Sequence, residues 1–119
     1  MESILIIDDD IQLSDILKEE LREVGYTAEA KYGAVEGLDY LKNNKIDLLL
    51  LDLNMPEKDG FYVLELLAAE KNPVKIIVLT AYADIGSAIR SAKLGASDFI
   101  TKPYDLDELL ISIRKVLHM

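Results

Sequence analysis

The sequence at Ile4–Asp10, ILIIDDD, sets an unbroken apolar run directly before three aspartates. Leu48–Leu51 and Ile76–Leu79 are apolar runs of the same length, again without alternating polar residues. Such runs are typical of strands that helices cover on both faces of a parallel sheet. We therefore predict that these three segments are central strands of one sheet.

Two further strands and five helices are predicted around these runs. Thr27–Lys31 has a mixed composition, which favours an edge strand, and Asp98–Thr101 has only Phe99 and Ile100 as strong strand formers. Apolar residues at helical spacing fill the segments between the strands. The predicted helices run from Leu13 to Val24, Ala34 to Leu41, Phe61 to Lys71, Asp84 to Leu94 and Leu106 to Leu117.

Residues that favour helix ends lie where this pattern needs them. Gly25 and Gly95 follow two of the predicted helices, and Asp105 with Glu108 matches the start of a capping box. Strands and helices that alternate through short connections require right-handed crossovers. We predict an α/β fold, namely a doubly wound (βα)5 flavodoxin-like arrangement whose five-stranded parallel sheet has the order 2-1-3-4-5, with helices on both faces.

The composition excludes several classes of function. A chain of 119 residues is expected to form one domain, residues 1–119, around one core. Because the chain has no cysteine, disulfides, thiolate catalysis and zinc–thiolate sites are excluded. The net charge of −9 opposes contact with nucleic acid or an anionic membrane. Without an apolar run of membrane-spanning length or a basic leader, we expect a cytoplasmic protein.

Acidic residues follow two of the predicted strands at the edge where the strand order reverses, which is where such sheets bind ligands. Asp8 and Asp9 follow the first strand and Asp52 follows the third, so three carboxylates are expected in one crevice. Their repulsion requires a cation or protons, and oxygen ligands without His or Cys favour Mg²⁺ over softer metals. Asp10 suits an N-cap, and a solvated helix start explains Asp8–Asp10 alone equally well.

Asp52 points beyond a simple cation site, because it ends a buried strand and precedes a turn. A carboxylate can act as a nucleophile toward phosphorus, and phosphoryl transfer mainly requires positioning and charge neutralisation. The Thr80 hydroxyl and the Ala81 N–H are candidate donors to phosphoryl oxygens, and Lys102 is a candidate counter-charge. Each suits an ordinary strand end or surface position alone, but together they predict a phosphoryl-acceptor site.

Five separated segments resemble the receiver domain of two-component response regulators, and they extend over essentially the whole chain. Each segment is weakly specific alone, whereas the ordered set is highly specific. The segments are Ile6–Asp9, Leu51–Pro56 with Asp59 and Gly60, Leu79–Ala81, Leu94–Ala96 with Asp98 and Phe99, and Thr101–Pro103.

The resemblance implies that a sensor histidine kinase or a histidine phosphotransferase phosphorylates Asp52. It implies a switch that catalyses only its own phosphorylation and dephosphorylation, rather than an enzyme that turns over a substrate. The implied Mg²⁺ ligands are Asp8, Asp9, Asp52 and the backbone carbonyl of Asn54, and the implied phosphoryl-binding residues are Asn54, Thr80, Ala81 and Lys102.

The resemblance also implies how the switch works. The Thr80 hydroxyl would turn toward the phosphoryl group and the Phe99 ring would turn inward. This would change the surface formed by the predicted helix Asp84–Leu94, the predicted strand Asp98–Thr101 and the predicted helix Leu106–Leu117. Phe99 also suits a permanently buried core ring. Members of the family usually have a cis bond at Lys102–Pro103, and Tyr82 and Asn54 occupy positions that tune the attack of water on the phosphoryl group.

Two other classes stay open at this point. A magnesium-dependent phosphatase of the haloacid dehalogenase type also uses a strand-end aspartate. That family has an Asp-x-Asp motif at the nucleophile, whereas this chain has Asn54 in place of the second aspartate. A phosphate-independent binding module would leave the acidic site vestigial, which the complete set of polar residues disfavours. We expect either a stand-alone receiver or one that works with an output domain or downstream protein outside this chain, and a dimer that forms on phosphorylation.

Overall fold

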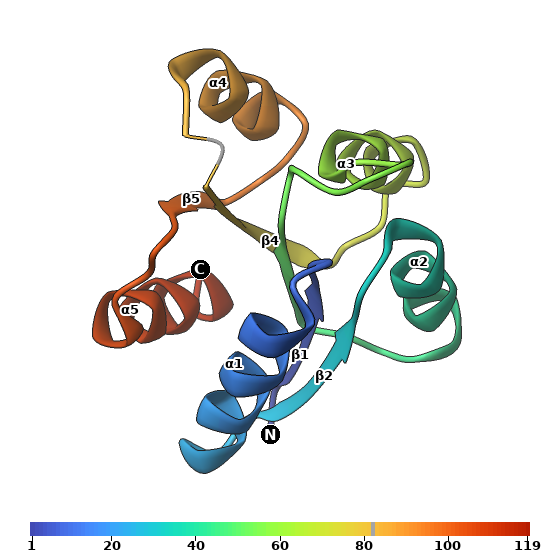
Figure 1. Ribbon diagram of the computed structural model, residues 1–119. Helices are drawn as coiled ribbons and strands as arrows, with labels where there is room; N and C mark the ends of the chain where they lie inside the picture. Colours follow the sequence, from blue (N-terminus) through green and yellow to red (C-terminus); the bar gives the residue numbers. More distant parts are fainter. Residues whose placement is uncertain (82) are drawn as a thin grey trace.

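The computed structural model describes residues 1–81 and 83–119, in which five strands alternate with five helices (Figure 1). Every predicted strand and helix is present. The strands are β1 (Ser3–Ile7), β2 (Thr27–Lys31), β3 (Leu48–Leu51), β4 (Lys75–Thr80) and β5 (Asp98–Thr101). The helices are α1 (Ile11–Glu23), α2 (Ala34–Asn43), α3 (Gly60–Ala69), α4 (Ile85–Lys93) and α5 (Leu106–Leu117).

The five strands form one parallel sheet in the order β2-β1-β3-β4-β5. β1 pairs with both β2 and β3, so that Ile4 lies opposite Ala28 on one side and Leu48 on the other. This topology confirms the predicted doubly wound fold, including the place of β2 at an edge. The strand order reverses between β1 and β3, and the carboxyl ends of these two strands therefore border the expected ligand crevice.

The sheet separates two hydrophobic layers. Leu5 and Ile7 of β1 face the layer that includes α2 and α3, whereas Ile4 and Ile6 face the layer that includes α1 and α5. Figure 1 shows the same division, with α1 and α5 on one face of the sheet and α2 and α3 on the other. Both faces of the central strands are buried, which is why their sequences lack polar alternation.

Four of the five helices in residues 1–81 and 83–119 begin with an aspartate cap. Asp10, Asp59, Asp84 and Asp105 precede α1, α3, α4 and α5, and each side chain accepts a backbone N–H of the first turn. These bonds satisfy N–H groups that have no partner within the helix. The expected roles of Asp10 and Asp105 are thus confirmed. None of the helices described has the length and apolar character needed to cross a membrane.

The outer edge of β2 is closed by side chains instead of another strand. The N–H of Thr27 bonds toward β1, so the backbone groups of Ala28 and Ala30 face outward. Arg22 of α1 donates from Nε and Nη2 to the carbonyl oxygen of Ala28 at 3.1 and 2.8 Å. The Glu29 carboxylate accepts the N–H of Ala30 at 3.1 Å. This charged edge opposes pairing with a strand of another chain.

Candidate functional site

Three carboxylates meet at the carboxyl ends of β1 and β3. One oxygen each of Asp8, Asp9 and Asp52 lies within 4.8 Å of the others. Asp8 and Asp52 follow neighbouring strands and are 4% and 6% exposed, whereas Asp9 is exposed to solvent. The structure therefore brings together the three acidic residues that the sequence predicted to share one crevice.

Backbone hydrogen bonds fix the two buried carboxylates. Asp8 Oδ1 accepts the N–H of Asp10 at 3.0 Å, and Asp52 Oδ1 accepts the N–H of Asn54 at 3.1 Å. One oxygen of each carboxylate is thereby committed to the backbone. The Oδ2 atoms of Asp8 and Asp52 are held beside the same ammonium group, that of Lys102 after β5, at 2.5 and 3.4 Å.

Burial and charge shift the pKa values in this cluster. Burial raises the pKa of the Asp8 carboxyl, and the negative charge of Asp52 adds to the rise, although the hydrogen bond from Lys102 partly offsets it. Burial alone would lower the pKa of the Lys102 ammonium, but its hydrogen bond and charge interaction with Asp8, together with the charge of Asp52, raise it. Lys102 therefore stays protonated and offsets one of three negative charges.

The donor set fits a hard divalent cation. Carboxylate oxygens are the ligands that Mg²⁺ takes in proteins, and a few of them beside an exposed edge leave room for its retained waters. Asp8, Asp9 and Asp52 supply these oxygens, and the uncompensated negative charge supplies the electrostatic drive. The backbone of Asn54, fixed by its bond to Asp52, lies beside the cluster.

Thr80 and Phe99 lie on neighbouring strands and face the same side of the sheet. Thr80 ends β4 and is fully buried, and its carbonyl oxygen accepts the N–H of Lys102 at 2.9 Å. Phe99 pairs with Val78 in the sheet, and its half-buried ring packs against the layer of α2 and α3. The exposed residue Ala81 follows Thr80 at the same end of the sheet. The role expected for Tyr82 falls outside the described residues.

Gly60 and Lys102 have structural roles that sequence reasoning missed. A Cβ at Gly60 would lie 2.4 Å from the carbonyl oxygen of Asp52 and 2.7 Å from the Cα of Leu53. The chain after Asp52 thus returns so closely that only glycine fits. The direct bond from Lys102 to Asp8 was also unexpected, because the sequence suggested Lys102 as a counter-charge and phosphoryl ligand but not as a partner of one particular aspartate. The turn that contains Pro56 and Gly60 was a signal for the role of Gly60. No local sequence feature indicated the bond from Lys102 to Asp8.

A tyrosine anchors the loop that carries Lys102. The Tyr104 hydroxyl donates to Glu20 Oε1 of α1 at 2.7 Å, across 84 residues of sequence. Burial, followed by the interactions with Glu20, raises the pKa of Tyr104. Tyr32 makes a similar bond to Asp15 of α1 at 2.6 Å. Side-chain hydrogen bonds therefore connect helix α1 to two loops, the one that follows β2 and the one between β5 and α5.

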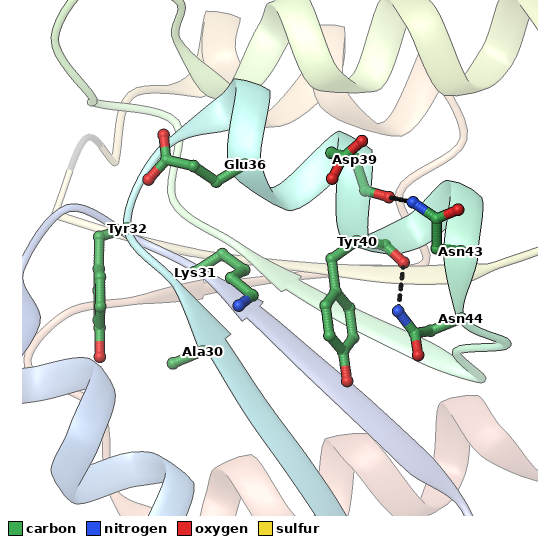
Figure 2. A pocket seen from close by; sticks show the side chains of 8 residues that line it. All are labelled: Ala30, Lys31, Tyr32, Glu36, Asp39, Tyr40, Asn43 and Asn44. Atoms are coloured by element: carbon green, nitrogen blue, oxygen red, sulfur yellow. Dashed lines mark hydrogen bonds between the residues drawn. The ribbon is translucent and has the colours of Figure 1, made fainter.

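A separate hollow of about 430 Å³ lies between β2 and α2, away from the acidic cluster. Figure 2 shows Lys31 between the rings of Tyr32 and Tyr40, and the Lys31 ammonium lies 5.1 Å from the centre of the Tyr40 ring. The amides of Asn43 and Asn44 bond back to carbonyl oxygens of α2. This hollow includes none of the residues predicted to bind phosphoryl or metal.

Comparison with known proteins identifies the family. Residues 4–114 match the model of the response regulator receiver domain. The chain belongs to this family. Receiver domains of two-component systems are phosphoacceptor switches that work with histidine kinases, and they are not conventional enzymes. Membership in this family therefore favours a receiver domain over the phosphatase considered as an alternative.

Two curated relatives illustrate the match of this receiver domain. It is 36% identical over 114 residues to the response regulator MprA of Mycobacterium sp. strain KMS, which covers 96% of this chain and 50% of that protein. It is 40% identical over 116 residues to the probable transcriptional regulator ycf27 of Porphyridium aerugineum, covering 98% of this chain and 48% of the relative. The chain thus spans about half the length of these curated relatives.

Solved receiver domains have the same fold. The receiver domain protein of Methanospirillum hungatei superposes with a TM-score of 0.94 at 33% identity, covering 99% of this chain and 94% of that one. The response regulator TrrA of Thermotoga maritima, solved in complex with Mg²⁺-BeF, gives a TM-score of 0.87 at 34% identity, covering 98% and 99%. The flavodoxin-like fold of this receiver domain is therefore shared with experimentally solved members of the family.

Proposed function

We propose that this receiver domain accepts a phosphoryl group onto Asp52 in a magnesium-dependent reaction. The donor is the phosphohistidine of a sensor histidine kinase or of a histidine phosphotransferase. The observation that carries this proposal is the convergence of Asp52 with Asp8, Asp9 and the Lys102 ammonium at one end of the sheet. The Mg²⁺-BeF complex of the similar protein TrrA supports it.

In the proposed transfer, an oxygen of Asp52 forms a bond to phosphorus while the bond from phosphorus to the histidine nitrogen breaks. The nitrogen keeps the electron pair, and the product is an acyl phosphate. Lys102 neutralises the transferred charge, and the Thr80 hydroxyl and the backbone N–H of Ala81 donate to phosphoryl oxygens. The chain catalyses only this phosphorylation and the later hydrolysis, in which water forms a bond to phosphorus, the Asp52 carboxylate leaves and inorganic phosphate is released, with Asn54 beside the phosphoryl group.

We assign the Mg²⁺ ligands to Asp8, Asp9, Asp52 and the backbone carbonyl of Asn54. Bound Mg²⁺ would supply positive charge that Lys102 alone does not provide. The short distances among the three carboxylates and the fixed backbone at Asn54 support this assignment.

The proposed switch uses Thr80 and Phe99 to change the surface of α4, β5 and α5. Their common sheet face supports it, as does a hollow of about 220 Å³ beside Phe99 that is lined by small residues such as Ala88, Ser91 and Ala92. Such a space lets an aromatic ring change its rotamer without displacing a packed core.

We further propose that the domain acts in the cytoplasm on an output domain or a downstream protein, without touching nucleic acid itself. The net charge of −9 supports the absence of nucleic-acid contact. Phosphorylation would favour a dimer through α4 and α5, where Ile85, Ile89 and Ile111 are 80%, 51% and 63% exposed.

Incubation with acetyl phosphate and Mg²⁺, followed by intact-mass measurement, tests the acceptor. We expect the mass of one phosphoryl group to be added to the wild type, and no addition without Mg²⁺ or in Asp52→Asn. Asp59→Asn provides a matched control, because this exposed cap residue lies in the same turn. Phosphorylation that persists in Asp52→Asn would contradict the assignment.

A further inference from the structure

A groove with an apolar floor lies between the carboxyl-terminal ends of α3 and α4. Its volume is about 300 Å³. Leu67 and Ile76, which are only 3% and 4% exposed, contribute to its floor and belong to the hydrophobic layer beneath. Lys71 and Lys93 are exposed at its rim, and no acidic residue of the described chain lines it. Since Ile76 lies near the start of β4, the groove is at the opposite end of the sheet from Asp52.

The positive charge of this groove is uncompensated. Neither Lys71 nor Lys93 forms an ion pair within residues 1–81 and 83–119, although Lys18, Arg22 and Arg90 pair with carboxylates elsewhere. The whole chain carries a net charge of −9. The groove is therefore a locally basic, partly apolar site on a protein whose overall charge is negative.

The backbone at Lys71 makes this lysine unusual. Helices α1 and α4 are followed by Gly25 and Gly95 with φ of 107° and 104°, but α3 is followed by Lys71 with φ of 53°. A left-handed backbone is strained for a residue with a side chain and relaxed for glycine. Glu57, with φ of 65°, is the other non-glycine residue of the described chain in this conformation. A cation at a helix end is favourable, which partly compensates for the strain at Lys71.

We propose that the groove binds an acidic peptide segment of a partner protein, in which one large apolar residue is flanked by Asp or Glu. The apolar side chain covers Leu67 and Ile76, and the flanking carboxylates pair with Lys71 and Lys93. Charge complementarity selects this partner, because a basic or neutral segment gains nothing from the two ammonium groups. Exposed ion pairs are weak individually, so the apolar contact is required as well.

Amide NMR shifts of ¹⁵N-labelled protein test the groove with blocked peptides. The probe is acetyl-Asp-Glu-Phe-Glu-Asp-amide, compared with the same peptide carrying Ser for Phe and with acetyl-Lys-Lys-Phe-Lys-Lys-amide. We expect the first peptide to shift the signals of Leu67–Asn72 and Lys93–Gly95. The Ser peptide should bind more weakly, and the basic peptide should leave these signals unchanged.

Charge reversal supplies the decisive comparison. Lys71→Glu and Lys93→Glu should each lower the affinity for the acidic peptide by about five-fold or more. Lys42→Glu makes the same change in the last turn of α2 and should leave the affinity unchanged. Lys71→Gly should also weaken binding while raising the melting temperature, which separates lost binding from lost folding. Absence of shifts at the groove, or unchanged affinity in the Lys71 and Lys93 variants, would overturn the proposal, whatever the outcome at Asp52.

Discussion

The ammonium of Lys102 lies 2.5 Å from Oδ2 of Asp8, a residue 94 positions earlier in the chain. Their side chains are only 14% and 5% exposed. Charges removed from water to this degree are stable only when they are paired and hydrogen-bonded. The bond joins the carboxyl end of the last strand to that of the first, and it sets the charge balance of the site at which we propose metal binding and phosphorylation.

Replacement of Lys102 by Met should therefore destabilise the metal-free protein. Three carboxylates would remain without their counter-charge, and we expect the free energy of unfolding to fall by about 2 kcal/mol at neutral pH. Mg²⁺ should restore part of this loss, because it replaces the missing positive charge. Urea denaturation with and without MgCl₂ measures both effects. Lys115→Met on the exposed side of α5 is the matched control, and an equal loss there would contradict the interpretation.

Replacement of Asp9 by Asn should have the opposite effect on stability. Asp9 is exposed, and its charge lies close to those of Asp8 and Asp52. Removing it relieves repulsion, so we expect about 0.5–1 kcal/mol of added stability in EDTA. Mg²⁺ affinity should fall in the same variant. Thermal unfolding and calorimetric titration of MgCl₂ provide the two measurements, and tighter Mg²⁺ binding would exclude Asp9 as a ligand.

Part of this architecture followed from the sequence because its causes are local. The unbroken run at Leu48–Leu51 identified a strand buried on both faces, and Gly25 and Asp105 marked helix ends. The crevice followed from topology, since parallel strands that end in aspartate must bring these residues to one edge. The strand order needed only the rules for short right-handed crossovers.

Other features depend on contacts that no local pattern records. α3 ends at Ala69 and not at Lys71, because Lys71 takes the left-handed conformation, and a lysine gives no sign of this in the sequence. α2 continues to Asn43, two residues beyond the predicted end. The Lys102–Pro103 bond is cis, which the family resemblance implied and composition alone did not.

The raised pKa of Asp8 predicts a specific pH dependence. Burial, followed by repulsion from Asp52, moves this pKa above its usual 3.8 in the folded state. The folded state therefore binds the proton more tightly than the unfolded state, and this contribution to stability grows as the pH falls through the folded pKa. We expect the stability of the wild type, relative to Asp8→Asn, to increase from neutral pH toward about pH 4. Urea denaturation across this range, in EDTA, measures the difference, and a decrease would contradict it.

Replacement of Gly60 by Ala should distort the acceptor turn. The new Cβ would meet backbone atoms of Asp52 and Leu53, which cannot move aside as a flexible side chain can. We expect a loss of about 2 kcal/mol or more in the free energy of unfolding, together with slower phosphorylation of Asp52. Gly86→Ala is the matched control, because its nearest neighbour is a side-chain oxygen of Asp84 at 3.2 Å. That change lies within α4 and should be neutral or stabilising.

Replacement of Tyr104 by Phe should loosen the loop that carries Lys102, because it removes only the hydroxyl that donates to Glu20. We expect a loss of about 1 kcal/mol at neutral pH and slower phosphorylation by acetyl phosphate. Burial and Glu20 raise the pKa of Tyr104 above 10.0, so the folded state favours the protonated phenol. The stabilising contribution is then complete below pH 10 and declines at higher pH, where the unfolded chain ionises first.

Urea denaturation of the wild type and Tyr104→Phe at rising pH measures this decline as a shrinking difference in stability. Tyr32→Phe is the matched control, since Tyr32 binds Asp15 of the same helix but follows β2 instead of preceding α5. If Tyr104 acts through the position of Lys102, the Tyr32 variant should be phosphorylated by acetyl phosphate at the wild-type rate. Equal slowing in both variants would instead indicate that α1 as a whole, and not the Lys102 loop, limits the reaction.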